Sequence, residues 1–456
     1  MANTEKLDTH HKALTLNLAA STFGSFAEIG AGQEVARWFL KVGGASGTVA
    51  KTISAYDKEV SDDLYGSGSR YVSKQRLEAM LDKEWSDLQT QLNKTRGPQT
   101  RFFSFADTIE ARNYAGTNDP HGWIGLRFQL QPGSPPNDIV LHINLRDPAN
   151  ALQQEAIGIL GVNLIFAAFF QLRTMESFLD GLTEDVVRQR IEIDFAEVRG
   201  PAFSGWDQQT LLAYLVHAGF AEVVCFSSRG TGIPPSEALH KKAAVLAPGY
   251  FSHVDAAHAQ IHIHLLAAGV QELRKELGEA AAAPIGFFCL TAAAFEPGAP
   301  VPELPDLLRR MNALLRQGGD VLLFREPQLY TMTGLVNRYT SAPLRFVVGL
   351  SLLIRAFEDP YGNLEGRRFE ALARLFAQNV RIYAYPMTLG DLEEWLKDNS
   401  AARWEWNETN GIVTAKGLRH KPPLGHLYAY LLASNFLVSI ETPANSVGNS
   451  ESGSPG

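Results

Sequence analysis

The sequence predicts an α/β fold, because short apolar strands alternate with amphipathic helices along its second half. Runs such as AEVVCF (221–226), IGFFCL (285–290) and DVLLF (320–324) are almost continuously apolar, as strands buried on both faces are. The segments between them carry apolar residues at helical spacing, and Gly or Asn follows several of the expected helices. Together these observations predict a mainly parallel sheet covered by helices.

The N-terminal half predicts a glycine-rich α+β organisation. A glycine-rich stretch (23–66) precedes an amphipathic helix over 74–93, in which Leu, Met and Trp recur every three or four positions. Strands are expected at 101–113, 121–130 and 139–145. The apolar segment 151–172 predicts a buried core helix, because its uninterrupted apolar run is shorter than the ~20 residues of a membrane span.

The second half continues the strand and helix alternation. Further strands are expected at 191–198, 243–246 and 380–385, and helices at 208–217, 254–277, 304–316, 345–357 and 364–378. This pattern predicts an N-terminal arm (1–22), an α+β domain (23–180), an α/β domain (181–440) and a disordered tail (441–456).

Composition and charge exclude several classes of protein. The 456 residues are 45% hydrophobic and 20% charged, as in globular proteins with a core. Lys and Arg number 41 and Asp and Glu 49, so the net charge of −8 disfavours a nucleic-acid partner. The start lacks the apolar segment of an export signal, and Cys225 and Cys289 lie in apolar runs. We therefore expect a cytoplasmic protein without a membrane partner.

Blocks along nearly the whole chain carry a family resemblance. They include FAEIGAGQEVARWFLKVGGASGTVAKTISAYDKEV, RYVSKQRLEAMLDKEW, HGWIGLRFQ, RIEIDFAEVRGPAFSGWD and LEGRRFEALARLF. These blocks resemble a widespread bacterial family of cytosol-like α/β proteins without an established activity. The label TonB-dependent receptor, sometimes attached to similar sequences, does not suit a chain without an export signal or serial alternating strands. The resemblance implies one shared architecture and leaves the function open.

The strongest local signal is the turn SFAEIGAGQE (25–34), in which Glu28, Gly30 and Gly32 precede a helix. A Gly-x-Gly turn before a helix brings backbone amides against a phosphate or ribose, so these three residues are candidate cofactor-binding residues. The alternative is a tight turn that packs the region onto the core, with one glycine at positive φ. A third glycine of the dinucleotide motif is missing, and Glu34 would repel a phosphate.

A second candidate is Lys51, which follows the segment GGASGTVA. Lys51 and Thr52 resemble the end of a P-loop, but alanine stands at two positions where that loop needs glycine. A looser anion site around Lys51 and a small-residue helix contact both stay open as interpretations.

Three further residues are candidate catalytic groups because they lie in expected loops: Asp57, His121 and Asp207. Asp57 and Asp207 also suit the ends of helices, where a carboxylate caps backbone amides. His253, His258, His262 and His264 include a pair four residues apart, but Ala259 stands where zinc hydrolases carry Glu, so we expect surface histidines and no metal site.

These observations are compatible with two classes of function. The first is a cytoplasmic enzyme or binder for a nucleotide-like or phosphorylated small molecule, with an S-adenosylmethionine-dependent transferase as an alternative and the cofactor unidentified. The second is a non-catalytic assembly or scaffold protein, including a homo-oligomer. It rests on the lack of familiar catalytic signatures and on apolar helices expected at 151–172 and 345–357.

Overall fold

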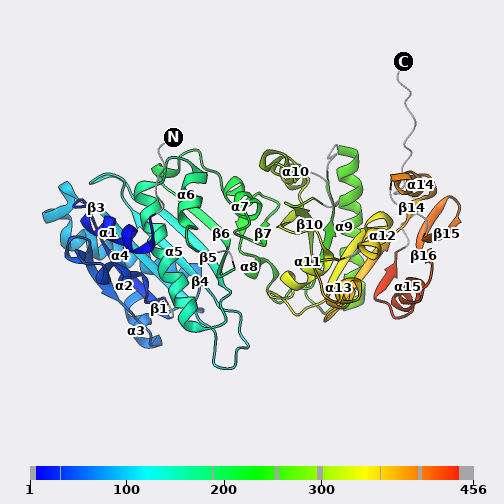
Figure 1. Ribbon diagram of the computed structural model, residues 1–456, viewed down its shortest axis with the longest axis horizontal. Coiled ribbons are helices and arrows are strands. Elements are labelled where there is room, and N and C mark those ends of the chain that lie inside the picture. The colour runs from blue at the N-terminus through cyan, green and yellow to red at the C-terminus, as the bar shows by residue number, and fades with distance from the viewer. Residues whose placement is uncertain are drawn as a thin grey trace, which may run out of the picture. The chain divides into compact units, whose positions relative to one another are not determined.

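The computed structural model describes residues 7–30, 32–186, 189–251, 256–294, 301–359, 361–398 and 403–440 (Figure 1). The chain divides into two compact units, Met1–Val224 and Cys225–Gly456. Helices flank the sheets, which confirms the α/β class, but the sheets are mixed rather than mainly parallel.

The first unit contains a six-stranded sheet in the order β2-β1-β3-β4-β5-β6. The strands are β1 (Thr22–Gly30), β2 (Val49–Ile53), β3 (Arg101–Glu110), β4 (His121–Phe128), β5 (Asn137–Leu145) and β6 (Ile191–Arg199). β1 pairs in parallel with β2 and β3, whereas β3 to β6 pair antiparallel. The connections from β3 to β4 and from β4 to β5 are too short for the crossover that parallel pairing needs, so they close hairpins.

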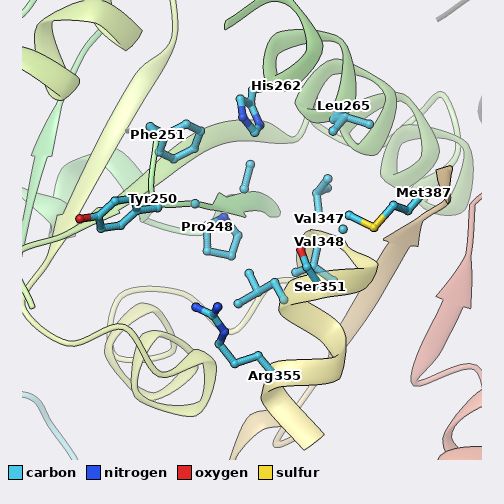
Figure 2. Close-up of a pocket in the computed structure, with 14 residues that line it drawn as sticks. Pro248, Tyr250, Phe251, His262, Leu265, Val347, Val348, Ser351, Arg355 and Met387 are labelled. Carbon is cyan, nitrogen blue, oxygen red and sulfur yellow. The ribbon is translucent and has the colours of Figure 1, made fainter. Parts of the chain in front are cut away.

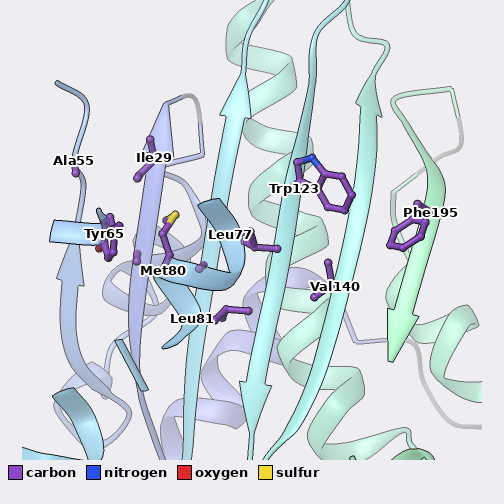
Figure 3. Packing of buried hydrophobic residues seen from close by; sticks show 11 residues of the cluster. Ile29, Ala55, Tyr65, Leu77, Met80, Leu81, Trp123, Val140 and Phe195 are labelled. Atoms are coloured by element: carbon purple, nitrogen blue, oxygen red, sulfur yellow. The ribbon is translucent and has the colours of Figure 1, made fainter. Parts of the chain in front are cut away.

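Helices cover both faces of this sheet. The helices of the unit are α1 (Thr9–Leu18), α2 (Val35–Lys41), α3 (Lys58–Tyr65), α4 (Lys74–Arg96), α5 (Asn150–Phe170), α6 (Met175–Leu182) and α7 (Gln208–His217). On the face covered by α4, Leu77, Met80 and Leu81 pack against Trp123 and Val140 (Figure 3). The helix α5 is long and apolar enough to cross a membrane, but 72% of its apolar window is buried inside the fold. The expected core helix is confirmed.

The second sheet has eight strands in the order β17-β13-β12-β9-β10-β11-β7-β8. They are β7 (Val223–Phe226), β8 (Gly232–Ile233), β9 (Ala244–Pro248), β10 (Ile285–Thr291), β11 (Asp320–Phe324), β12 (Leu344–Gly349), β13 (Val380–Tyr385) and β17 (Leu437–Ser439). Pairing is parallel from β17 to β9 and from β9 to β11, and antiparallel between β7 and β8.

The helices of the second unit connect these strands, and the strands of a small separate sheet lie between β13 and β17 in the sequence. The helices are α8 (Pro235–Leu239), α9 (Ala256–Leu277), α10 (Leu304–Arg316), α11 (Leu329–Val336), α12 (Leu350–Glu358), α13 (Arg367–Leu375), α14 (Leu389–Asp398) and α15 (Leu424–Ala433). The small antiparallel sheet has the order β14-β16-β15, with β14 (Met387–Thr388), β15 (Trp404–Thr409) and β16 (Ile412–His420).

Three expectations from the sequence differ from these elements. The chain divides between Val224 and Cys225 rather than between 180 and 181, because β6 completes the first sheet by pairing with β5. The expected arm contains α1, whose buried Lys12 forms an ion pair with Glu184 at 2.8 Å. The expected helix 345–357 is a strand followed by a helix, β12 and α12. The expected tail (441–456) lies outside the described residues.

The core of the first unit gives a prediction about stability. The Phe26 side chain has no exposed surface, and its ring centroid lies 4.9 Å from that of Phe39 and 5.4 Å from that of Phe103. Phe26→Ala should lower the free energy of unfolding by about 3–5 kcal/mol, because it leaves a cavity that this packed site cannot close. Phe369 is 76% exposed, so Phe369→Ala is the matched control and should change stability little. Equal losses in urea unfolding of the two variants would contradict this packing.

Candidate functional site

The glycine turn after β1 is fixed by close contacts of its backbone. Gly30 has φ +80°, which confirms that one of the two glycines adopts positive φ. A methyl group added at Gly30 would lie 2.1 Å from the carbonyl oxygen of Ile109, and one added at Gly32 would lie 1.9 Å from Oδ1 of Asp107. Both positions therefore require glycine for packing within the fold.

Glu28 occupies the start of the helix that follows the turn. Its carboxylate accepts hydrogen bonds from the backbone amides of Val35 at 2.8 Å and Ala36 at 3.1 Å, which belong to the first turn of α2. These amides have no partner inside the helix and are the groups that would hold a cofactor phosphate. The chain thus fills its own anion position at the turn that the sequence suggested for a cofactor.

The other candidates from the N-terminal half have identified partners. Lys51 forms an ion pair with buried Glu84 on α4, with Nζ 2.7 Å from the carboxylate. Asp57 caps α3 and Asp207 caps α7 through their carboxylates, the latter by accepting from the backbone amide of Thr210. Lys51, Asp57 and Asp207 therefore each contact a different helix, α4, α3 and α7 respectively, and these contacts do not assemble them into one site.

His121 lies beside a buried polar pair that sequence reasoning missed. Its ring centroid is 5.5 Å from that of His142, whose Nδ1 is 2.6 Å from the carboxylate of Asp194. Asn144 donates to the other oxygen of that carboxylate at 2.8 Å, and the Trp123 ring packs on His142 at 4.8 Å. The alternation of IVLHINL identifies the strand, but no sequence pattern indicates that His142 meets an acid on β6.

Asp107 is the second site residue that sequence reasoning missed. It is the Cα partner of Glu28 across the parallel β1–β3 pair and has no exposed surface, while Glu28 is 4% exposed. Within the described part of the chain, neither side-chain oxygen of Asp107 has a hydrogen-bond partner of normal geometry, and the nearby backbone amide of Ile29 only partly opposes the effect of burial. Burial raises the pKa of Glu28 to about 7, and burial with the charge of Glu28 raises the pKa of Asp107 well above its usual range. The signal available was one acid within the apolar run FFSFADTI.

The second unit contains a cavity of about 550 Å³ at the carboxyl ends of β9 and β12 (Figure 2). Most of its wall is apolar and includes Pro248, Phe251, Val347, Val348 and Met387. Such a volume with a largely apolar lining is the usual anatomy of a small-molecule site.

A few polar groups complete the cavity. Ser351 and Arg355 come from α12, which begins directly after β12, and His262 comes from α9 (Figure 2). Tyr250 lies in the loop after β9, and the guanidinium of Arg310 stacks on its ring at 4.2 Å. The amides of the first turn of α12 have no partner inside the helix, so this end of the cavity attracts negative charge.

Two residues of the cavity wall, Phe251 and Gly349, have informative backbone conformations. Phe251 adopts φ +50°, a conformation that is rare for a bulky side chain, and its ring packs against that of His262 at 4.8 Å. Gly349 has φ −76°, and a methyl group added to it would meet only Ser351 Oγ, at 4.0 Å. Of the histidines weighed in the sequence, His262 reaches this cavity, whereas His253 and the side chain of His258 lie outside the described residues.

The carboxyl pair predicts how stability depends on pH. Because folding raises both pKa values, the folded protein holds protons that the unfolded chain releases. The contribution of Glu28 and Asp107 to the free energy of unfolding should therefore be largest below about pH 4. It should fall as the pH rises through about 7. Asp107→Asn should flatten this dependence and be more stable than wild type at pH 8 in urea unfolding with EDTA present.

The control for that substitution is Glu84→Gln, which removes an equally buried carboxylate that has Lys51 as its partner. It should lower the free energy of unfolding at pH 8, because Lys51 loses the buried carboxylate that is its ion-pair partner. A loss of stability at pH 8 in Asp107→Asn as large as in Glu84→Gln would contradict the raised pKa of Asp107.

The turn predicts a difference between two glycine substitutions. Gly32→Ala should lower the melting temperature, because the new methyl group collides with the Asp107 carboxylate. A loss of about 1–3 kcal/mol is expected for such overpacking. Gly334→Ala, at an exposed helical position with nothing within 4 Å, should keep or raise it. A Gly32→Ala variant as stable as Gly334→Ala would show that the turn has free space.

Comparisons with known proteins add little to this geometry. No protein-family model matches the chain, and no curated protein matches it. Among solved structures, it is similar to the competence/damage inducible protein CihA from Agrobacterium tumefaciens, at 18% identity and TM-score 0.26 over 36% of this chain and 96% of that chain. A competence or damage-inducible protein from Enterobacter asburiae matches at 12% identity and TM-score 0.26, over 36% of this chain and 99% of that one. Likeness at this level carries no argument about function.

Proposed function

We propose that this protein binds a small molecule with an anionic group, and that the cavity between β9 and β12 holds it. The observation that carries the proposal is the place of the cavity in the strand order. From β9 the chain continues through α9 to β10 on one side, and from β12 it continues to β13 on the other. Ligands in open α/β sheets bind outside the carboxyl ends of strands at such a reversal point.

The lining supports a ligand with an apolar body and one charged end. Pro248, Phe251 and Val348 offer an apolar wall, which favours a ring or an alkyl chain. The charged end is expected between the guanidinium of Arg355, which comes from the last turn of α12, and the backbone amides of the first turn, because both turns line the cavity and both groups favour a carboxylate or phosphate. Nucleotide-like and phosphorylated molecules fall within this class, and the cytoplasm, where they are abundant, is the proposed location.

The test uses two fluorescent probes that differ by one charge. The anion 8-anilino-1-naphthalenesulfonate and its neutral analogue N-phenyl-1-naphthylamine share an aromatic body, so their titrations separate the apolar wall from the anion site. Arg355→Met should weaken binding of the anion about tenfold or more and leave the neutral probe nearly unchanged, because it removes a charge-assisted contact. Arg374→Met, on an exposed position of α13, is the matched control.

A second variant tests whether the probes enter the cavity. Gly349→Ala should keep the melting temperature, because its backbone suits alanine, but should weaken both probes, because the new methyl group stands in the cavity. The control is Gly334→Ala. If Arg355→Met and Gly349→Ala both bind the two probes as wild type does, the cavity is not the binding site. If the probes do bind in the cavity, adenosine monophosphate and glucose 6-phosphate are added as competitors. Displacement of the anionic probe by one of them would show whether the site prefers a nucleotide or a sugar phosphate.

A further inference from the structure

The first unit contains a reversal point of its own, independent of the cavity in the second unit. From β1 the chain passes through α2 to β2 on one side, and it then returns through α3 and α4 to β3 on the other side of β1. Glu28 and Asp107 are partners near the carboxyl ends of these two parallel strands, β1 and β3. This is the position where an open α/β sheet presents groups to a ligand.

The two carboxylates stand without a positive partner in the described part of the chain. Neither Glu28 nor Asp107 forms an ion pair there, and both are almost fully buried. Two negative charges in such a place are costly unless a positive charge joins them. Buried Glu84, by contrast, has Lys51 at 2.7 Å.

Asp107 differs from an ordinary structural acid. Among the described residues, neither of its oxygens has a hydrogen-bond partner of normal geometry, although the backbone amide of Ile29 lies close enough to oppose the rise of its pKa. Polar groups buried in folded proteins nearly always have a well-formed hydrogen bond. Glu28 uses one lone pair of each oxygen for the amides of α2, so each oxygen keeps a lone pair to offer. The pair therefore offers up to four carboxylate oxygens as ligands for a metal ion.

We propose that Glu28 and Asp107 bind one divalent cation of the Mg²⁺ class. Carboxylate oxygens are the ligands that this class of ion prefers, and Mg²⁺ usually keeps several water ligands besides one or two carboxylates. Glu28 also lines a cavity of about 390 Å³ with Gln33, Thr52 and Ser54, which gives water and the ion a polar route to Glu28. Arg37 and Lys41 line the same cavity; Arg37 forms an ion pair with Glu34 at 2.8 Å, and Lys41 lies over the Trp38 ring. A proton takes the place of the cation when the cation is absent.

One other group among the described residues could bind the probe metal and must be removed. Asp8, His10 and His11 are exposed and bring their ligand atoms within 4.8 Å of one another. His10→Ala and His11→Ala together form the reference chain, so that the remaining oxygen-rich site is measured alone.

The experiment counts Mn²⁺ bound to the EDTA-treated reference chain by electron paramagnetic resonance at pH 7.5, with Mg²⁺ as competitor. The proposal expects one Mn²⁺ per chain, displaced by Mg²⁺, and none after Asp107→Asn. It also expects added Mg²⁺ to raise the melting temperature of the reference chain by about 3 °C or more, and not that of Asp107→Asn. Glu84→Gln is the control for a lost buried acid and should keep the bound ion.

Each other outcome overturns the proposal. No bound Mn²⁺, together with a pH dependence of stability that Asp107→Asn removes, would show that the pair holds only a proton. Bound Mn²⁺ that survives Asp107→Asn would place the ion elsewhere. If Asp107→Asn does not fold, Asp107→Ser replaces it, and nitrogen couplings to Mn²⁺ in the folded reference chain would contradict a site made of carboxylates. None of these readouts depends on the cavity of the second unit.

Discussion

Both candidate sites lie between two neighbouring parallel strands whose outgoing connections run in opposite directions. This strand arrangement sets the position of each site. Such strands need crossover helices, so their carboxyl ends meet at one edge and the loops that follow them diverge. In the second unit this happens between β9 and β12, and the space that results is a cavity with an apolar wall and a few polar groups. In the first unit it happens between β1 and β3, where two carboxylates stand instead.

The two edges differ because the segments after their strands differ. After β12, Gly349 leads directly into α12, so the first amides of that helix and the side chain of Arg355 face the cavity. After β1, the turn folds back until Gly32 touches Asp107, and Glu28 takes the first amides of α2. Under our two proposals, the same sheet geometry serves an anionic ligand in one unit and a cation in the other.

Sequence patterns locate most elements because their apolar periodicity is long or bounded by glycine. β11 and β13 match their expected bounds, as does α7. The prediction of one helix over 345–357 is wrong, since a short apolar run fits a buried strand as well as a buried helix. That error hides the cavity, because the carboxyl end of β12 is part of its wall. Asp107 and the pair of His142 with Asp194 escape prediction because their partners lie on other strands, and register is not visible in one sequence.

Binding of an anionic small molecule in the cavity between β9 and β12 is tested most directly by hydrogen–deuterium exchange. With 8-anilino-1-naphthalenesulfonate bound, the amides of Leu350, Ser351 and Leu352 should exchange more slowly, as should those of the loop that holds Tyr250 and Phe251. Peptides covering α2 and β3 in the first unit should not change. Protection confined to the first unit, or no protection along α12, would contradict binding in this cavity.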